Sequence, residues 1–250
     1  DAADVMITTI REALAGAHPR AIHVGAAGAG RARVAEHLRE LIALAFRGAH
    51  VDENTQIVPF YRGYAPFAND DPRKARITLG NLLTMSPGYA CDDNDDDSPG
   101  QEDRIQENAH DWYRATLDLP MAYDPGSRAV YCSQGMNLIG GVLSGATHAW
   151  LPDFFDTALA RPLQFGHYYM PMMPTGTMYL GGGEYVMPRD FLKLGQLFLD
   201  GGTWNGRRLM SADWVRRSLQ PYTGLQAPGD YGLTWHIYHF TVGGKTYVAQ

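Results

Sequence analysis

The chain has 250 residues and a formal net charge of -6 at pH 7, with 45% hydrophobic and 19% charged residues. This size and composition provide a hydrophobic core that does not depend on disulfides, which excludes disordered, fibrous and disulfide-scaffold proteins. The acidic balance offers no basic surface to a phosphate backbone, so we expect no nucleic-acid partner. No apolar run approaches the roughly 18 residues that span a bilayer, and no signal peptide is recognisable, so we expect a soluble chain of undetermined compartment and oligomeric state.

The first half of the chain predicts helices separated by polar loops. A short apolar run predicts a strand over 21–24. Hydrophobic residues at helical spacing predict helices over 5–14, 31–46, 79–83 and 110–117. Thr78 is suited to cap the third of these helices, which Pro87 and Gly88 then end. An acidic loop over 92–97 separates the third helix from the fourth.

The second half predicts further helices and then a hairpin. An extended piece over 128–131 follows the turn at Pro125 and Gly126. Helical spacing, with a proline or serine near several of the starts, predicts helices over 136–143, 152–159, 188–199 and 212–219. Alternation over 231–240 predicts a strand that a glycine turn joins to a second strand over 246–248. This order predicts an α+β fold, which we expect to form a single domain over 1–250.

The triplet Tyr131, Cys132 and Ser133 lies where the extended piece meets a helix. A phenol and a hydroxyl at such a turn can both face a cleft beside the positive end of the helix. Taken alone, the triplet is more typical of a buried tyrosine followed by a serine helix cap. Ser133, Gln134 and Gly135 also match part of the G-x-S-x-G nucleophile elbow of α/β-hydrolases, although Tyr131 replaces the first glycine and no parallel sheet is predicted.

Two other segments have the composition of ligand sites. The acidic loop places oxygen-bearing side chains at alternate positions, as in a calcium loop: Asp92, Asn94, Asp96 and Ser98. Asp97 stands where the tight turn needs glycine, so we expect a solvated loop instead. Three glycines at 181–183 predict either a turn of positive φ or a close approach to a ligand. The nine histidines show no metal-ligand spacing, so we expect neither a metal site nor a cofactor.

Several motifs, in the same order along the chain, resemble those of serine β-lactamases and penicillin-binding-protein-like hydrolases. They are Ile77 to Gly88, Tyr131 to Ser133 with Asn137 to Gly140, Arg161 to Leu163, and Gly181 to Gly183 before Pro188 to Phe191. Over residues 52–250 the chain looks most like the class C branch, which includes esterases and the 6-aminohexanoate-dimer hydrolase. The resemblance implies a serine β-lactamase-type α+β fold, and hydrolysis of a small amide, ester or lactam through an acyl-serine.

The resemblance also implies roles for individual residues. Tyr131 would be the acid/base that passes a proton to the leaving group, and Ser133 would be its hydrogen-bonding neighbour. A phenol with a pKa near 10 can act as a base only where nearby cations favour the phenolate. Cys91 and Cys132 have counterparts in the branch that the chain resembles, where a disulfide between them would tether the acidic loop to the cleft.

The sequence departs from this family at the nucleophile. The Ser-x-x-Lys motif is expected near the start of the helix over 31–46, where Gly30 and Arg33 stand. Glycine has no nucleophilic group, and arginine stays protonated at neutral pH. None of the three lysines follows a serine or threonine by three positions. Either residues 1 to about 35 replace the N-terminal segment of the family, or the chain is a catalytically silent protein that keeps the cleft for binding.

The third family motif, a Lys-Thr-Gly or glycine-rich strand, is expected just after Gln250. Lys245, Thr246 and Tyr247 resemble it superficially, but they lie on the return strand of the predicted hairpin. Tyr247 would also crowd the side where glycine is needed, so we expect an ordinary strand. The oxyanion hole of the family uses backbone N–H groups of the nucleophile and of that third strand, so its second donor is unassigned.

Overall fold

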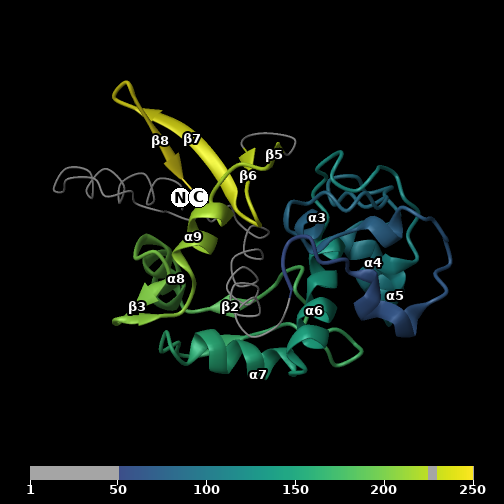
Figure 1. Ribbon diagram of the computed structural model, residues 1–250, viewed down its shortest axis with the longest axis horizontal. Coiled ribbons are helices and arrows are strands. Elements are labelled where there is room, and N and C mark those ends of the chain that lie inside the picture. The colour runs from purple at the N-terminus through teal and green to yellow at the C-terminus, as the bar shows by residue number, and fades with distance from the viewer. Residues whose placement is uncertain (1–50, 225–229, 250) are drawn as a thin grey trace.

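The computed structural model describes residues 51–224 and 230–249 (Figure 1). The elements predicted over 5–14, 21–24 and 31–46 lie outside these residues, as do Gly30 and Arg33. Within the described part, helices α3 to α6 gather on one side of the molecule, and α8 and α9 lie on the other (Figure 1). The longer strands come last in the chain, so the mixed α+β character expected from the sequence is confirmed.

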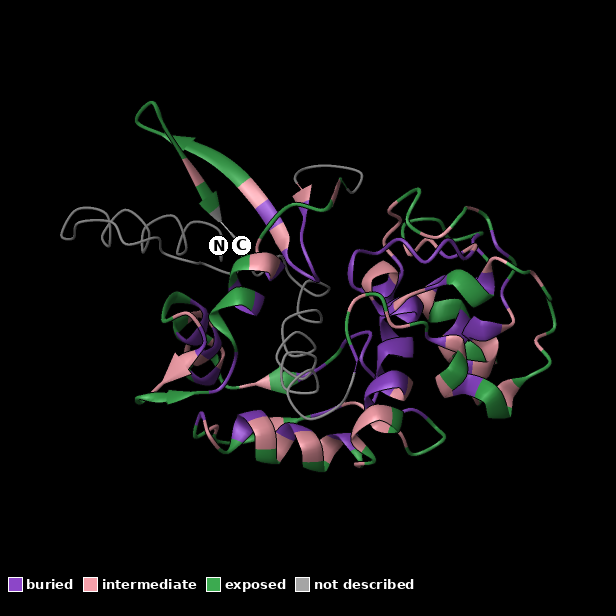
Figure 2. Ribbon diagram, viewed as in Figure 1, coloured by how far each residue is buried: buried purple, intermediate pink, exposed green. Residues whose placement is uncertain are grey.

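Helix α6 (Ser133–Thr147) is the centre of the helical region. It contacts the 3₁₀ segment η1 (Val58–Tyr64) and helices α3, α5 and α7, and its first eight residues are all buried (Figure 2). The Tyr61 hydroxyl donates a hydrogen bond to the carbonyl oxygen of Leu138 on this helix. Tyr61 comes so close that a Cβ at Gly141 would lie 2.3 Å from its hydroxyl, which only glycine permits. The helix is therefore fixed on several sides at once.

The helices around α6 begin at polar caps. Their bounds are Leu79–Leu83 for α3, Glu102–Asn108 for α4 and Trp112–Leu117 for α5, with a 3₁₀ turn η2 at Lys74–Arg76. The predicted cap is confirmed, because the Thr78 side chain accepts from the backbone N–H of Asn81, whose own side chain accepts from the N–H of Thr78. Helix α4 was not predicted, since its sequence is almost entirely polar.

The second group of helices follows α6 in the chain. The segment predicted over 152–159 is α7 (Leu151–Phe155), which continues into a π-helical turn η3 (Asp156–Ala160). The other two predicted helices are present as α8 (Pro188–Leu199) and α9 (Ala212–Ser218). Ser211 caps α9 by accepting from the N–H of Trp214 at 3.1 Å. No helix within the described ranges combines the length and hydrophobicity needed to cross a membrane.

All the strand pairs of the described residues are antiparallel. Two short pairs join β1 (Tyr168–Tyr169) to β2 (Tyr185–Val186) and β3 (Thr203–Trp204) to β4 (Arg207–Arg208). A four-stranded sheet has the order β5 (Thr223–Gly224), β6 (Asp230–Tyr231), β7 (His236–Val242), β8 (Lys245–Ala249). The predicted hairpin is present as β7 and β8, but the single strand predicted over 231–240 is wrong, because Tyr231 ends β6 and His236 begins β7.

The four-stranded sheet is anchored to the helices by the start of β7 and the segment before it. The backbone N–H of Thr234 donates to the carbonyl oxygen of Leu83 at the end of α3, at 2.9 Å. The Trp235 ring packs against Phe198 of α8, with ring centroids 4.8 Å apart. Beyond Tyr238 the hairpin is largely exposed (Figure 2). The sheet therefore contacts the helical region at the base of β7 and also at β5, where the Thr223 hydroxyl donates to the carbonyl oxygen of Thr84 at 3.1 Å.

Candidate active site

The sequence triplet forms a turn that leads directly into helix α6. Tyr131 is partly buried, and Cys132 and Ser133 are buried. Cys132 is the N-cap of α6, and its sulfur accepts from the backbone N–H of Gly135 at 3.1 Å. Ser133 is the first residue of the helix, so it is not the cap that its residue type indicates. Because the cap function belongs to the cysteine, the Ser133 hydroxyl is available for another contact.

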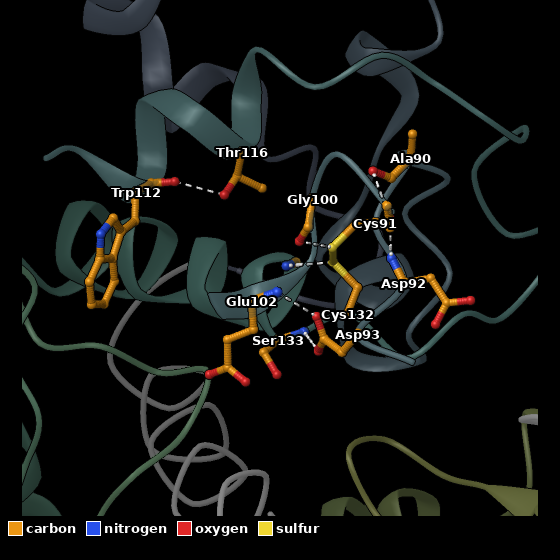
Figure 3. The surroundings of a disulfide bond; sticks show 12 residues. Ala90, Cys91, Asp92, Asp93, Gly100, Glu102, Trp112, Thr116, Cys132 and Ser133 are labelled. Carbon is orange, nitrogen blue, oxygen red and sulfur yellow. Dashed lines mark hydrogen bonds between the residues drawn. A yellow bond between two sulfur atoms is a disulfide. The ribbon is translucent and has the colours of Figure 1, made fainter. Parts of the chain in front are cut away.

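A disulfide joins Cys132 to Cys91, the pair that the resemblance implies (Figure 3). The two Cα atoms are 5.5 Å apart, and both side chains are buried. The Cys91 sulfur also lies 3.0 Å from the carbonyl oxygen of Gly100. The turn before α6 is therefore covalently tied to the start of the acidic loop.

Asp93 connects the acidic loop to the same turn by hydrogen bonds. Its carboxylate accepts from the backbone N–H of Ser133 at 2.7 Å and from that of Glu102 at 3.1 Å (Figure 3). The pKa of Asp93 is raised to about 6, chiefly by burial and in smaller part by the Glu102 charge, against the hydrogen bonds from Ser133 and Glu102, which lower it. A carboxyl group with a raised pKa beside a candidate catalytic turn is typical of functional sites.

Glu102 extends this cluster toward the glycine-rich segment. Its carboxylate accepts from the Tyr179 hydroxyl at 2.6 Å and from the Gln106 side chain at 3.0 Å. Burial raises the pKa of Tyr179 well above its usual value, and the Glu102 carboxylate adds to the effect. Tyr179 is therefore a neutral hydrogen-bond donor here. Its hydroxyl comes so near the backbone of Gly181 that a Cβ there would lie only 2.1 Å away.

The sheet side of the site is formed by aromatic rings. The His236 ring stacks on Tyr131, with centroids 5.8 Å apart and planes 25° apart. The same imidazole stacks on Tyr238 at 5.8 Å and meets the edge of Tyr231 at 5.0 Å. The start of α6 on one side and the His236 ring on the other restrict the orientation of the Tyr131 phenol.

The other predicted candidates have different positions and uses. The side chains of Asp92, Asp95 and Ser98 accept hydrogen bonds from backbone N–H groups of their own loop. No group of three or more acidic, histidine or cysteine side chains is arranged for a metal within 51–224 and 230–249. Of the glycines over 181–183, Gly183 adopts a φ of +83°, which favours glycine. Lys245 to Tyr247 form part of β8, an ordinary antiparallel strand, as expected.

Asp93, Glu102, Tyr179 and His236 were not identified from the sequence. Asp93 is one of several acidic residues in a row, and nothing in the composition of that run marks the one that turns inward. His236 approaches Tyr131 from a strand more than 100 residues later in the chain. The sequence pattern of the triplet predicted the start of a helix, but the residues that surround the triplet are brought there by tertiary contacts, which the local sequence does not show.

Comparison with known proteins identifies the family. The family model described as Beta-lactamase matches residues 29–249 of this chain. The chain therefore belongs to the β-lactamase family, and the resemblance drawn from its motifs is confirmed. The α/β-hydrolase alternative built on Ser133 is wrong, because that fold needs a parallel sheet, whereas every strand pair of the described part is antiparallel.

Solved structures agree with this fold at low sequence identity. A penicillin-binding protein from Bacillus halodurans matches 86% of this chain with 16% identity and a TM-score of 0.60. A D-stereospecific amidohydrolase from a Streptomyces species matches 88% with 13% identity and a TM-score of 0.64. A candidate 6-aminohexanoate-dimer hydrolase from Bacillus anthracis matches 82% with 16% identity and a TM-score of 0.62. The chain spans 70%, 74% and 55% of these three chains, respectively.

Proposed function

We propose that this chain hydrolyses a small compound with an amide, ester or lactam bond, through an acyl-serine, at the turn that carries Tyr131 and Ser133. The observation that carries the proposal is the position of this turn, which begins the buried helix α6 and is fixed by a disulfide and by the Asp93 carboxylate. A residue that transfers protons must be held within hydrogen-bond reach of the reacting atoms, so such bracing is what the chemistry requires.

In this proposal Tyr131 is the proton-transfer group. As a phenolate, Tyr131 accepts the proton of the attacking hydroxyl, and the phenol that results then donates this proton to the leaving group, so that one side chain acts first as general base and then as general acid. A neighbouring positive charge would lower the pKa of the phenol, and in the sequence Arg33, which stays protonated, stands where the family is expected to have its lysine. Ser133 serves as a hydrogen-bonding neighbour in the same turn.

The second candidate function is binding of the same compounds without catalysis. A specific observation favours it, because Gly30 stands where the family has its serine, and the first 50 residues contain no serine at all. Acyl transfer by the family route needs both an attacking hydroxyl and a group that removes its proton. A chain that has lost both would retain a cleft for recognition alone.

Covalent labelling separates the two candidates. The purified chain is treated with a fluorophosphonate and, separately, with a labelled penicillin, and tryptic peptides are then mapped by mass spectrometry. Hydrolysis predicts stoichiometric labelling of one serine other than Ser133, which would have to lie after residue 50 and so away from the expected nucleophile position, and a much slower reaction in Tyr131→Phe. Silent binding predicts no covalent label while the penicillin still binds reversibly. A label on Ser133 itself would contradict its assignment as a hydrogen-bonding neighbour.

The matched control for Tyr131 is Tyr123. Its hydroxyl accepts from the Arg128 guanidinium at 2.9 Å, at the side of a small hollow that both disulfide cysteines also line. Tyr123→Phe removes the same hydroxyl from the same part of the molecule without changing the turn. We therefore expect it to label at the wild-type rate, and an equal loss in both variants would remove the case for Tyr131.

A further inference from the structure

Asp93 behaves differently from the other acidic residues of its loop. The Asp92 and Asp95 carboxylates accept from backbone N–H groups two residues further along the loop, and residues 94–97 are exposed. The Asp93 carboxylate instead turns away from solvent and accepts from the first residues of two helices, α4 and α6 (Figure 3). Asp93 is therefore the carboxylate of this loop that bonds to the starts of α4 and α6, outside the loop itself.

The contact between Asp93 and the turn before α6 is two-sided. The backbone N–H of Asp93 donates to the carbonyl oxygen of Tyr131 at 2.9 Å, and its carboxylate accepts from the N–H of Ser133 at 2.7 Å. The residue between these two is Cys132, which is bonded to Cys91. Residues 91–93 thus hold each residue of the triplet by a separate link. A shift of this loop cannot leave Tyr131 or Ser133 in place.

We propose that Asp93 is a positioning residue, which holds Tyr131 and Ser133 in the geometry that the reaction needs. The inference rests on the function proposed for this turn. The backbone N–H of Ser133 donates to the Asp93 carboxylate, and the N–H of Asp93 donates to the carbonyl oxygen of Tyr131. A single residue thereby fixes the backbone on both sides of Cys132.

The strength of the hydrogen bonds that the Asp93 carboxylate accepts depends on whether the carboxylate is ionised. Hydrogen bonds to an ionised carboxylate are about twice as strong as neutral ones. The titratable groups that face Asp93 are Glu102, whose charge raises the pKa of Asp93, and Tyr179, whose hydroxyl donates to Glu102. Since the pKa of Asp93 is raised to about 6, the carboxylate is ionised above that pH, and its hydrogen bonds to the turn are then charge-assisted, although the buried charge itself lowers the stability of the fold.

The test uses the full chain with its disulfide intact, as wild type, Asp93→Asn and the control Asp95→Asn. Asp95 lies in the same loop, is exposed, and accepts only a local backbone hydrogen bond among those described. Nuclear magnetic resonance follows the backbone amides of Ser133 and Glu102 and the Tyr131 ring from pH 4.5 to 8. We expect both amides to titrate with a midpoint near 6 in the wild type and the control, and in Asp93→Asn we expect no such titration and a displaced Tyr131 ring signal.

A kinetic arm tests the positioning role directly. With a chromogenic ester, Asp93→Asn should lower kcat by about 10- to 100-fold with KM changed less than about twofold, because misplacing reacting groups costs rate more than binding. Asp95→Asn should leave both constants unchanged. The acidic limb of the kcat profile, with a midpoint near pH 6, should be lost in Asp93→Asn.

The outcomes separate this inference from the proposed function. If none of the three proteins hydrolyses an ester, the proposed function fails, and the resonance data still decide whether Asp93 holds the turn. Wild-type amides of Ser133 and Glu102 that do not move between pH 4.5 and 8 overturn the inference, and this result needs no variant to fold. A Tyr131 ring signal that is identical in Asp93→Asn and wild type at pH 8 overturns it as well.

Discussion

Tyr131 is held from two sides by parts of the chain that differ in kind. On the helical side, residues 91–93 reach it through a disulfide and backbone hydrogen bonds, and helix α6 behind them is buried along its first eight residues. On the sheet side, β7 meets it by ring stacking from His236, and the hairpin beyond is largely exposed. We call residues 91–93 and helix α6 the frame of this turn. The frame holds the turn by covalent and buried contacts, whereas the contact from the sheet side is ring stacking.

The largest contrast should appear when one apolar side chain is shortened on each side. Leu143 of α6 is fully buried, whereas Val242 at the end of β7 is 45% exposed. Leu143→Ala should lower the free energy of unfolding by about 2–5 kcal/mol, because it removes buried methyl groups and leaves a cavity. Val242→Ala should change it by less than about 0.5 kcal/mol. Urea denaturation measures both, and similar losses would contradict the contrast.

Removal of the disulfide should have the next largest effect. The double variant Cys91→Ala with Cys132→Ala opens a loop closed across 41 positions, so the unfolded chain gains freedom and stability falls by about 2–4 kcal/mol. Chemical denaturation of the variant and of reduced wild-type protein measures the loss. The two should agree with each other. A variant as stable as the oxidised wild type would show that the frame does not depend on this link.

Asp93 predicts a pH dependence of defined sign. Its folded-state pKa of about 6 lies above the ordinary value of 3.8, so the native state binds this proton more tightly than the unfolded state does. Its contribution to stability is therefore fully present below about pH 4 and is lost as the pH rises through 6, by up to about 3 kcal/mol. Asp93→Asn removes this dependence. The free energy of unfolding of wild type minus that of the variant should fall from pH 4 to 7, and a difference that rises would contradict the assignment.

The smallest effect should come from the sheet side. His236→Ala removes the ring that stacks on Tyr131 and should cost about 0.5–1.5 kcal/mol, the range for aromatic pairs. Tyr247→Ala, which removes the outer stack with Phe240, is the matched control on the same hairpin. Denaturation curves should show losses within this range for both. A loss of unfolding free energy above about 3 kcal/mol for His236→Ala would mean that the contacts of the sheet side contribute as much stability as those of the frame.

The difference between local and tertiary contacts also explains which helices and strands could be predicted from the sequence. Local signals were sufficient for the Thr78 cap, for α8 and α9, and for the hairpin, because each depends on neighbouring residues. Helix α6 begins at Ser133, three residues before the hydrophobic spacing begins, because its cap is a cysteine engaged in a disulfide. Helix α4 has too few apolar residues to produce a helical pattern.

The candidate site divides in the same way. The triplet could be placed at a helix start from its local sequence, and the family motifs indicated its role. Asp93 and His236 could not be found, since their selection depends on pairings made across about 40 and 100 residues of chain. Tyr131 and Ser133, for which we propose catalytic roles, could be named from the sequence, and the residues that contact them could not.

The most direct test of proton transfer by Tyr131 is the rate of chromogenic ester hydrolysis by wild type, Tyr131→Phe and Tyr123→Phe. If the turn before α6 performs proton transfer, Tyr131→Phe should be slower by about 10²- to 10⁴-fold, and Tyr123→Phe should match the wild type. Hydrolysis by Tyr131→Phe at the wild-type rate would contradict the central claim.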